Sequence, residues 1–167
     1  MARTERDGPM AAAVGVLEGI RALTPLTGEG VAAQFGARGW EAGGRPKGGF
    51  ETSWSKSGVI GWFHRYSGGV RVEFTVWMRD VDEDTGYFED LEAVYAEGEQ
   101  ALAGFLPQIE SSALSAHLSE AEGTAEDTDE YIAFRKWTLN GRMLTAGVVQ
   151  EDTDLPVRVV LVLEEQP

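Results

Sequence analysis

Six strand-like segments joined by short turns restrict what this chain can fold into. The segments are residues 50–56, 59–66, 70–81, 131–139, 142–151 and 156–163. Turns of two or three residues separate the first three, and the dipeptide Asn140-Gly141 in the second group is a strong hairpin signal. Parallel neighbours need a crossover of about a dozen residues or more, so these short connections predict mainly antiparallel pairing.

Alternating residues divide the segment 70–81 into two faces. The first face, which we expect to be core, carries Val70, Val72, Phe74, Val76 and Met78. The second face carries Arg71, Glu73, Thr75, Trp77 and Arg79. A tryptophan among charges is a common interface anchor, which makes Trp77 a candidate binding residue. The alternative is that Trp77 packs against a neighbouring helix.

Three helices are predicted around the strands. Pro9 suits the first position of a helix that ends before Pro25, and Thr27 can cap a short second helix that stops at Gly36. Between the two strand groups, apolar or small residues recur in steps of three and four at Phe88, Leu91, Tyr95, Gly98, Leu102, Phe105 and Ile109. Pro107 either kinks this long helix or begins another one.

The predicted order is therefore α-α-βββ-α-βββ, an α+β fold in which helices cover one face of an antiparallel sheet. A chain of 167 residues fits one domain, 1–167, with 1–8 as a flexible N-terminus. We expect residues 119–130 to form an exposed acidic loop. The segment 157–163 is a candidate edge strand open to pairing with a second copy, so a monomer and a homodimer both remain open.

The amino-acid composition indicates the compartment and the kind of genome that we expect for the protein. The chain has no Cys, which excludes disulfides and thiol catalysis and favours the cytoplasm. Its polar N-terminus lacks the apolar run of a signal peptide, and no apolar stretch reaches the roughly 20 residues that span a bilayer. Eleven Arg against three Lys is typical of a GC-rich genome, for example that of an actinobacterium.

Negative charge is concentrated in one part of the sequence. The chain has 28 Asp and Glu, 14 Lys and Arg, and a formal net charge of −14. Residues 80–130 hold sixteen of these acids and no Lys or Arg. Such a field repels nucleic acid and anionic membrane and attracts a cationic protein. We therefore expect a basic protein partner, with solubility alone as the alternative explanation of the acidic surface.

The candidate partner-binding residues lie where the acids are densest. They are Trp77, Asp80, Asp82, Glu83, Asp84, Glu89, Asp90, Glu92, Glu97 and Glu99. Glu89 and Asp90 fall in the first turn of the long predicted helix, where carboxylates also favour the positive end of the helix dipole. The sequence therefore predicts one acidic surface built from this helix and the residues before it.

Motifs for catalysis and ligand binding are missing from the sequence. The only histidines, His64 and His117, lie in no recognisable catalytic pattern. The glycine-rich stretch 42–48 departs from the loops that cradle phosphate groups in nucleotide sites. We therefore expect a protein that is not an enzyme and has no cofactor.

One run of acids comes close to a calcium loop. Asp80, Asp82 and Asp84 match its first three ligand positions. The sixth position, which requires Gly, is Thr85, and the twelfth, which requires a bidentate Glu, is Leu91. We expect no resident metal ion, with weak divalent binding by these carboxylates left open.

The segment 33–40 and a later tryptophan carry a resemblance. A short helix ends in Phe35-Gly36, Gly39-Trp40 leads towards the strands, and a long amphipathic helix and a strand with Trp137 follow. In this order, over residues 14–163, the chain resembles small actinobacterial immunity proteins of polymorphic toxin systems. The layout is also similar to type III secretion chaperone-like folds, from which this chain departs by ending on a strand.

The first resemblance implies a compact, non-catalytic protein that binds one secreted toxin and blocks its active site or a nearby surface. Many such toxins are basic nucleases, so an acidic surface would present carboxylates to the residues that hold phosphates. The second resemblance implies a secretion chaperone or adaptor that binds an apolar segment of an effector protein. A small-ligand-binding domain is the third alternative, and it would need a concave pocket with converging polar groups.

Overall fold

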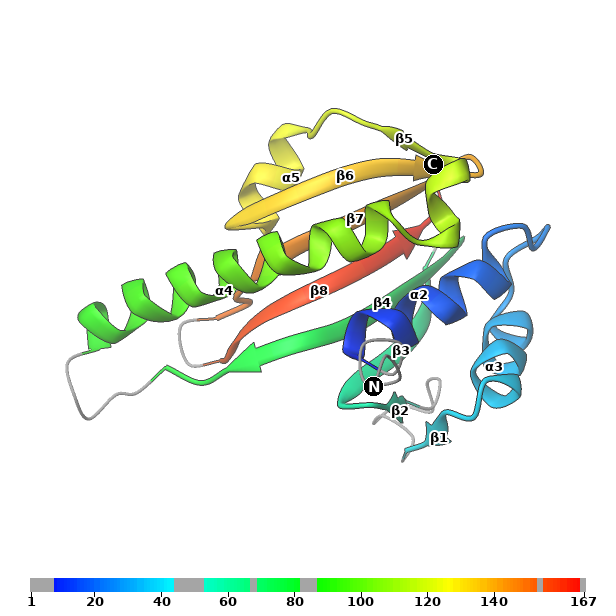
Figure 1. The fold of residues 1–167 in the computed structure, drawn as a ribbon, viewed down its shortest axis with the longest axis horizontal. Helices are drawn as coiled ribbons and strands as arrows, with labels where there is room; N and C mark the ends of the chain where they lie inside the picture. The colour runs from blue at the N-terminus through cyan, green and yellow to red at the C-terminus, as the bar shows by residue number, and fades with distance from the viewer. Residues whose placement is uncertain (1–7, 44–52, 67–68, 82–86, 153–154, 166–167) are drawn as a thin grey trace.

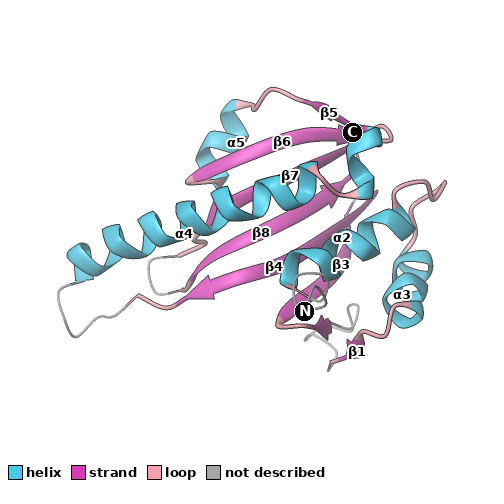
Figure 2. Cartoon of the chain, viewed as in Figure 1, coloured by secondary structure: helices cyan, strands magenta, loops and turns pink. Residues whose placement is uncertain are grey.

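The computed structural model describes residues 8–43, 53–66, 69–81, 87–152 and 155–165. These residues form an eight-stranded antiparallel sheet with the two longest helices side by side on one face (Figure 1). Coloured by secondary structure, the strands form one continuous layer behind these helices (Figure 2). The predicted α+β class and the order α-α-βββ-α-βββ are confirmed. No described helix is both long and apolar enough to cross a membrane.

Two helices and a strand meander make up the N-terminal half. Helix α2 covers Pro9–Ile20 and α3 covers Gly28–Ala37. As predicted, Thr27 caps α3, because its side-chain oxygen accepts a hydrogen bond from the backbone N–H of Gly30. The strands are β1 (Glu41–Ala42), β2 (Trp54–Lys56), β3 (Val59–Tyr66) and β4 (Gly69–Arg79). Residues 50–52 of the predicted first strand lie outside the described residues.

The C-terminal half begins with the long helix α4, Tyr87–Glu110, which continues through Pro107 without a second helix starting there. The elements that follow are the 3₁₀ helix η1 (Ala113–His117), β5 (Leu118–Glu120), α5 (Ala125–Glu130), β6 (Ala133–Leu139), β7 (Arg142–Val149) and β8 (Val157–Glu164). Asn140 and Gly141 join β6 to β7 with φ angles of 51° and 82°. Positive φ at both central residues is what the predicted two-residue hairpin turn requires.

Strand β8 lies in the middle of the sheet, whose order is β1-β2-β3-β4-β8-β7-β6-β5. The prediction that residues 157–163 form an edge strand is therefore wrong. From Val159 to Leu163 every side chain is at most 1% exposed, so β8 is buried on both faces. A continuous apolar run without alternation is typical of such a central strand. Its backbone pairs with β4 and β7 and is not open to a second copy.

Strand β4 contains an irregularity that exchanges its two faces. The register with β8 shifts between Thr75 and Trp77, so that one residue is inserted as a β-bulge. Before the shift, Phe74 faces the helices, as predicted. After it, Trp77 takes that face and packs against the core, while Met78 is 54% exposed. The predicted alternation is therefore wrong beyond Val76, because a bulge moves every later side chain to the opposite face.

The acidic segment 119–130 is not a loop throughout. Ser119 and Glu120 belong to strand β5, and α5 begins with a capping box formed by Thr124 and Asp127. In this box the Thr124 side chain accepts from the backbone of Asp127, and the Asp127 carboxylate accepts from the backbone of Thr124. The expectation of an exposed loop missed this Thr-x-x-Asp pattern, although many of its side chains are exposed.

The main core lies between the sheet and the helices. Helix α2 packs on β3 and β4, whereas α4 runs along β4, β8 and β7. At one end the rings of Phe35 and Trp54 stack with centroids 5.4 Å apart, and Trp40 meets Phe35 edge-on at 4.9 Å. Phe35 and Trp40, which carried the sequence resemblance, are therefore core residues that fix α3 against the sheet.

Candidate protein-binding surface

Helix α4 presents its acidic side to solvent. Its buried positions are Val94, Gly98, Leu102 and Ile109, which face the sheet. The last three belong to the predicted set and Val94 does not, whereas the predicted Leu91, Tyr95 and Phe105 are half-buried. Gly98 allows a close approach, since a Cβ there would lie 3.1 Å from Val148 and 3.5 Å from the ring of Trp77. The side of α4 away from the sheet therefore carries the charged residues at fixed, helical spacing.

Three exposed carboxylates on α4 have no ion pair with a described residue: Glu89, Glu92 and Glu99. We call these three residues the acidic stripe. Spacings of three and seven residues place them on one side of the helix. Two further predicted residues, Asp90 and Glu97, lie on the flank of α4 beside β4. There the guanidinium of Arg79 contacts both, with an Nη2–Oδ1 distance of 3.6 Å to Asp90.

The remaining predicted binding residues are Trp77, Asp80, Asp82, Glu83 and Asp84. Asp80 is exposed directly after β4, whereas Asp82, Glu83 and Asp84 lie outside the described residues. Trp77 is half-buried and packs beneath α4 near Gly98. The structure therefore brings Glu89, Glu92 and Glu99 together on one surface and places Trp77 in the packing between helix and sheet.

Several acids in the second half of the segment 80–130 form ion pairs with Arg135 and Lys136 of strand β6. The guanidinium of Arg135 contacts both Glu110 and Glu120, and Lys136 donates to Asp127 with an Nζ–Oδ2 distance of 2.8 Å. Burial acts to raise the pKa of Asp127, but the hydrogen bonds from Lys136 and Thr124 outweigh it and lower that pKa. Of these pairs only Lys136–Asp127 is largely buried, so it is the one that we expect to stabilise the fold around β6 and α5.

A second group of charges lies on the sheet face opposite α2 and α4. Glu73 is only 5% exposed and accepts hydrogen bonds from the indole N–H of Trp62 and from Arg158, each at 3.1 Å. Arg71 lies 3.5 Å from the same carboxylate and also contacts Glu130 and Glu164. We call Glu73 with Arg71 and Arg158 the sheet-face network.

Each charged side chain of the sheet-face network contacts at least one side chain of opposite charge. Burial acts to lower the pKa of Arg71, but hydrogen bonding to Glu130 and the charge of Glu164 raise it, which keeps the guanidinium charged. Burial and the nearby charge of Glu130 raise the pKa of Tyr131. A hollow of about 250 Å³ beside these residues also contains the carboxylates of Asp129 and Glu151. Alternation in β4 and β8 places Arg71, Glu73 and Arg158 on one face, but sequence reasoning did not identify them as a network.

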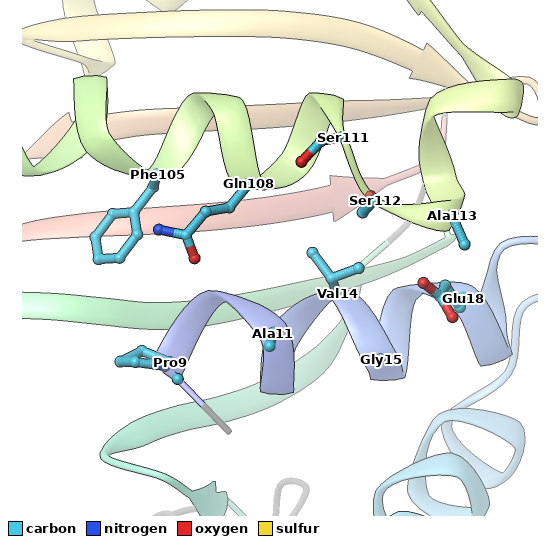
Figure 3. A pocket seen from close by; sticks show the side chains of 11 residues that line it. Pro9, Ala11, Val14, Gly15, Glu18, Phe105, Gln108, Ser111, Ser112 and Ala113 are labelled. Carbon is cyan, nitrogen blue, oxygen red and sulfur yellow. The ribbon is translucent and has the colours of Figure 1, made fainter. Parts of the chain in front are cut away.

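A groove separates α2 from the C-terminal end of α4 and from η1 (Figure 3). Its volume is about 940 Å³. Ala11 and Gly15 of α2 leave the space open, while Phe105 and Gln108 project into it from α4. Glu18 is its one charged lining residue among those described. The sequence predicted both helices but not their separation, which depends on how each packs on the sheet.

The histidines and possible metal ligands occupy ordinary positions. His64 lies on β3 with its ring 4.9 Å from that of Trp62, and His117 is exposed at the end of η1. Within the described ranges, no group of three or more His, Cys, Asp or Glu side chains is arranged to hold a metal ion. Two of the three acids of the calcium-like run, Asp82 and Asp84, fall outside those ranges.

Comparisons with protein-family models, with curated proteins and with solved structures gave no match for this chain. The acidic stripe and the groove are therefore interpreted from their own geometry and charge.

Proposed function

We propose that this chain is a non-catalytic binding protein that neutralises a basic protein partner through the solvent side of α4. The observation that carries the proposal is the acidic stripe, whose three carboxylates have no counter-ion among the described residues. It belongs to a segment of sixteen acids without a single Lys or Arg. An immunity protein that blocks a cationic toxin, such as a nuclease, fits this surface, and the cytoplasm is where we expect it to act.

The rigidity of α4 supports this proposal. The helix has 24 residues and contacts three central strands, so its carboxylates are held at fixed spacing before a partner arrives. A preorganised surface loses little conformational entropy on binding. Complementary charge also raises the rate of encounter, an effect that salt weakens because the Debye length falls from about 10 Å at 0.1 M to about 3 Å at 1 M.

The test is affinity capture from the host's own lysate with three forms of the tagged chain. The wild type is compared with Glu89→Gln/Glu92→Gln/Glu99→Gln and with a matched control, Glu122→Gln/Glu126→Gln/Asp129→Asn, which removes the same charge from exposed positions elsewhere. We expect the wild type and the control to retain one basic protein that the stripe variant loses and that high salt releases.

Function is then checked by co-expressing the captured protein with each form. Rescue of growth by the wild type and the control, but not by the stripe variant, supports an immunity role. Capture that neither salt nor the stripe variant reduces contradicts the proposal.

The groove between α2 and α4 favours a second candidate, a chaperone or adaptor for an effector protein. Its walls are mainly small and apolar, and Val14 of α2 and Phe105 of α4 are its larger apolar side chains. An apolar client segment would be held there by burial, which salt does not weaken. Capture that resists high salt and is lost in Gly15→Gln, but persists in the stripe variant, would favour this role.

A further inference from the structure

A small cationic pocket lies apart from the acidic stripe, between the start of α2 and the turn that joins β2 to β3. Arg38, Trp40, Lys56 and Ser57 line it together with Ala11, Ala12 and Gly15 of α2. Its volume is about 130 Å³. A water molecule takes up about 30 Å³ in the liquid, so this space fits one small ion and its hydration rather than a drug-sized ligand.

The basic side chains of the described residues differ in whether they contact a carboxylate. Six described basic side chains contact a carboxylate within 4 Å: Arg71, Arg79, Arg135, Lys136, Arg142 and Arg158. Among the remaining described ones, Arg21 donates to Asn140, and Arg38 and Lys56 have no carboxylate partner in the described part of the chain. In a protein with 28 acids and 14 bases, two adjacent cations without a carboxylate leave the pocket positive.

The local structure holds these cations in place. The Lys56 ammonium donates to the backbone carbonyl of Arg38 at 2.6 Å, which leaves two of its three N–H donors for another acceptor. Gly15 makes room for the guanidinium, because a Cβ there would lie 3.4 Å from Nη1 of Arg38. The Lys56 ammonium is therefore fixed on the backbone of Arg38, and both side chains line the same pocket.

Two further features add positive potential without adding an acceptor. Trp40 is 5% exposed, and its buried indole N–H has no hydrogen-bond partner among the described residues. Such an unsatisfied buried donor is unfavourable, and an entering acceptor can offset that cost. Helix α2 begins at Pro9 after Gly8, which offers no side-chain cap, and its first turn contains no acid, so no described carboxylate of this turn neutralises its N-terminal N–H groups.

We propose that this pocket binds a phosphate group, with Arg38 and Lys56 as its charged ligands and the Trp40 indole as a nearby donor. A tetrahedral oxyanion can accept hydrogen bonds from several directions, which suits donors that converge from a helix, a loop and a strand. The site shares no residue with the acidic stripe, so it does not depend on the proposed binding of a basic partner, whereas Ala11 and Gly15 also line the groove between α2 and α4.

The experiment is a titration of the full chain with sodium phosphate at low ionic strength, followed by the indole N–H resonances in a ¹⁵N–¹H spectrum. Sodium chloride at matched ionic strength is the reference. We expect a saturable shift of the Trp40 indole signal and of the backbone signals of Arg38 and Lys56 with phosphate only.

Variants separate a built site from general attraction. We expect Arg38→Gln/Lys56→Gln to weaken phosphate binding by about tenfold or more, the exchange Arg38→Lys/Lys56→Arg to retain it, and Arg21→Gln, which removes one half-buried cation elsewhere, to leave it unchanged. Equal shifts with chloride, no saturation, or the same affinity in the Gln/Gln variant would overturn the proposal.

Discussion

The acidic stripe on α4 and the sheet-face network use the same kind of side chain for different purposes. Glu73 in the network is buried and receives hydrogen bonds from Trp62 and Arg158. Glu92 in the stripe is exposed and has no ion pair with a described residue. A buried carboxylate must be paired, whereas an exposed one costs little when it has no partner. Pairing therefore separates the charges that stabilise the fold from those that are available to another molecule.

Removing Glu73 is the strongest test of this difference between paired and unpaired carboxylates. We expect Glu73→Ala to lower the free energy of unfolding by about 3 kcal/mol, because two guanidinium groups and an indole N–H lose a buried acceptor. Urea denaturation measures this loss. Glu73→Gln, which keeps the shape and one oxygen acceptor, should lose less, and Glu92→Ala on the stripe should change little. Equal stability of Glu73→Ala and Glu92→Ala would contradict the distinction.

Trp77 lies on the same strand as the sheet-face network but beneath the helix that carries the acidic stripe. Sequence alternation predicted it on the charged face of β4, whereas in the structure it packs beneath α4. Loss of the indole removes packing against Gly98, so we expect Trp77→Ala to lower the free energy of unfolding by about 2 kcal/mol. That is below the cost for a fully buried tryptophan, because Trp77 is half-buried. Met78→Ala, at an exposed neighbouring position, is the control. Unchanged stability of Trp77→Ala would indicate that the ring faces solvent.

The different outcomes for Trp77 and for the hairpin show what a sequence can and cannot reveal. Asn140-Gly141, Thr27 and the steps of α4 act within a few residues, so their local chemistry predicted the turn, the cap and the buried face. The bulge beside Val76 carries no such signature in β4, whose alternation continues unbroken through it. The central position of β8 depends on pairing with β4, about ninety residues earlier in the chain. Long-range pairing of this kind is not contained in local periodicity.

The candidate surface could likewise be predicted from the sequence only in part. The absence of Lys and Arg from residues 80–130 identified the acidic surface directly. Arg79 neutralises the flank of α4 at Asp90 and Glu97, whereas Glu89, Glu92 and Glu99 have no counter-ion within the described ranges. This difference depends on where β4 meets the helix. The cations that bind Glu110, Glu120 and Asp127 likewise come from β6.

Asp127 makes the stability of the fold depend on pH. Its hydrogen bonds to Lys136 and Thr124 lower its pKa in the folded protein from the ordinary value of 3.8, despite the opposing effect of burial. The charged form therefore stabilises the fold above pH 3.8, and this contribution is lost as the pH falls through the lowered pKa. We expect Asp127→Asn to be less stable than the wild type by about 1 kcal/mol at neutral pH. Urea denaturation between neutral and acid pH should show the difference shrinking, and a constant difference would contradict it.

The smallest effect on stability is expected from the acidic stripe itself. Neutralising Glu89, Glu92 and Glu99 removes mutual repulsion on one side of α4 but also favourable charge near its N-terminus at Glu89, so the two effects oppose each other. We expect Glu89→Gln/Glu92→Gln/Glu99→Gln to change the free energy of unfolding by less than about 0.5 kcal/mol. The same variant should lose the basic partner. If it instead unfolds as readily as Glu73→Ala, these carboxylates stabilise the fold and the stripe is no longer distinguished from the sheet-face network.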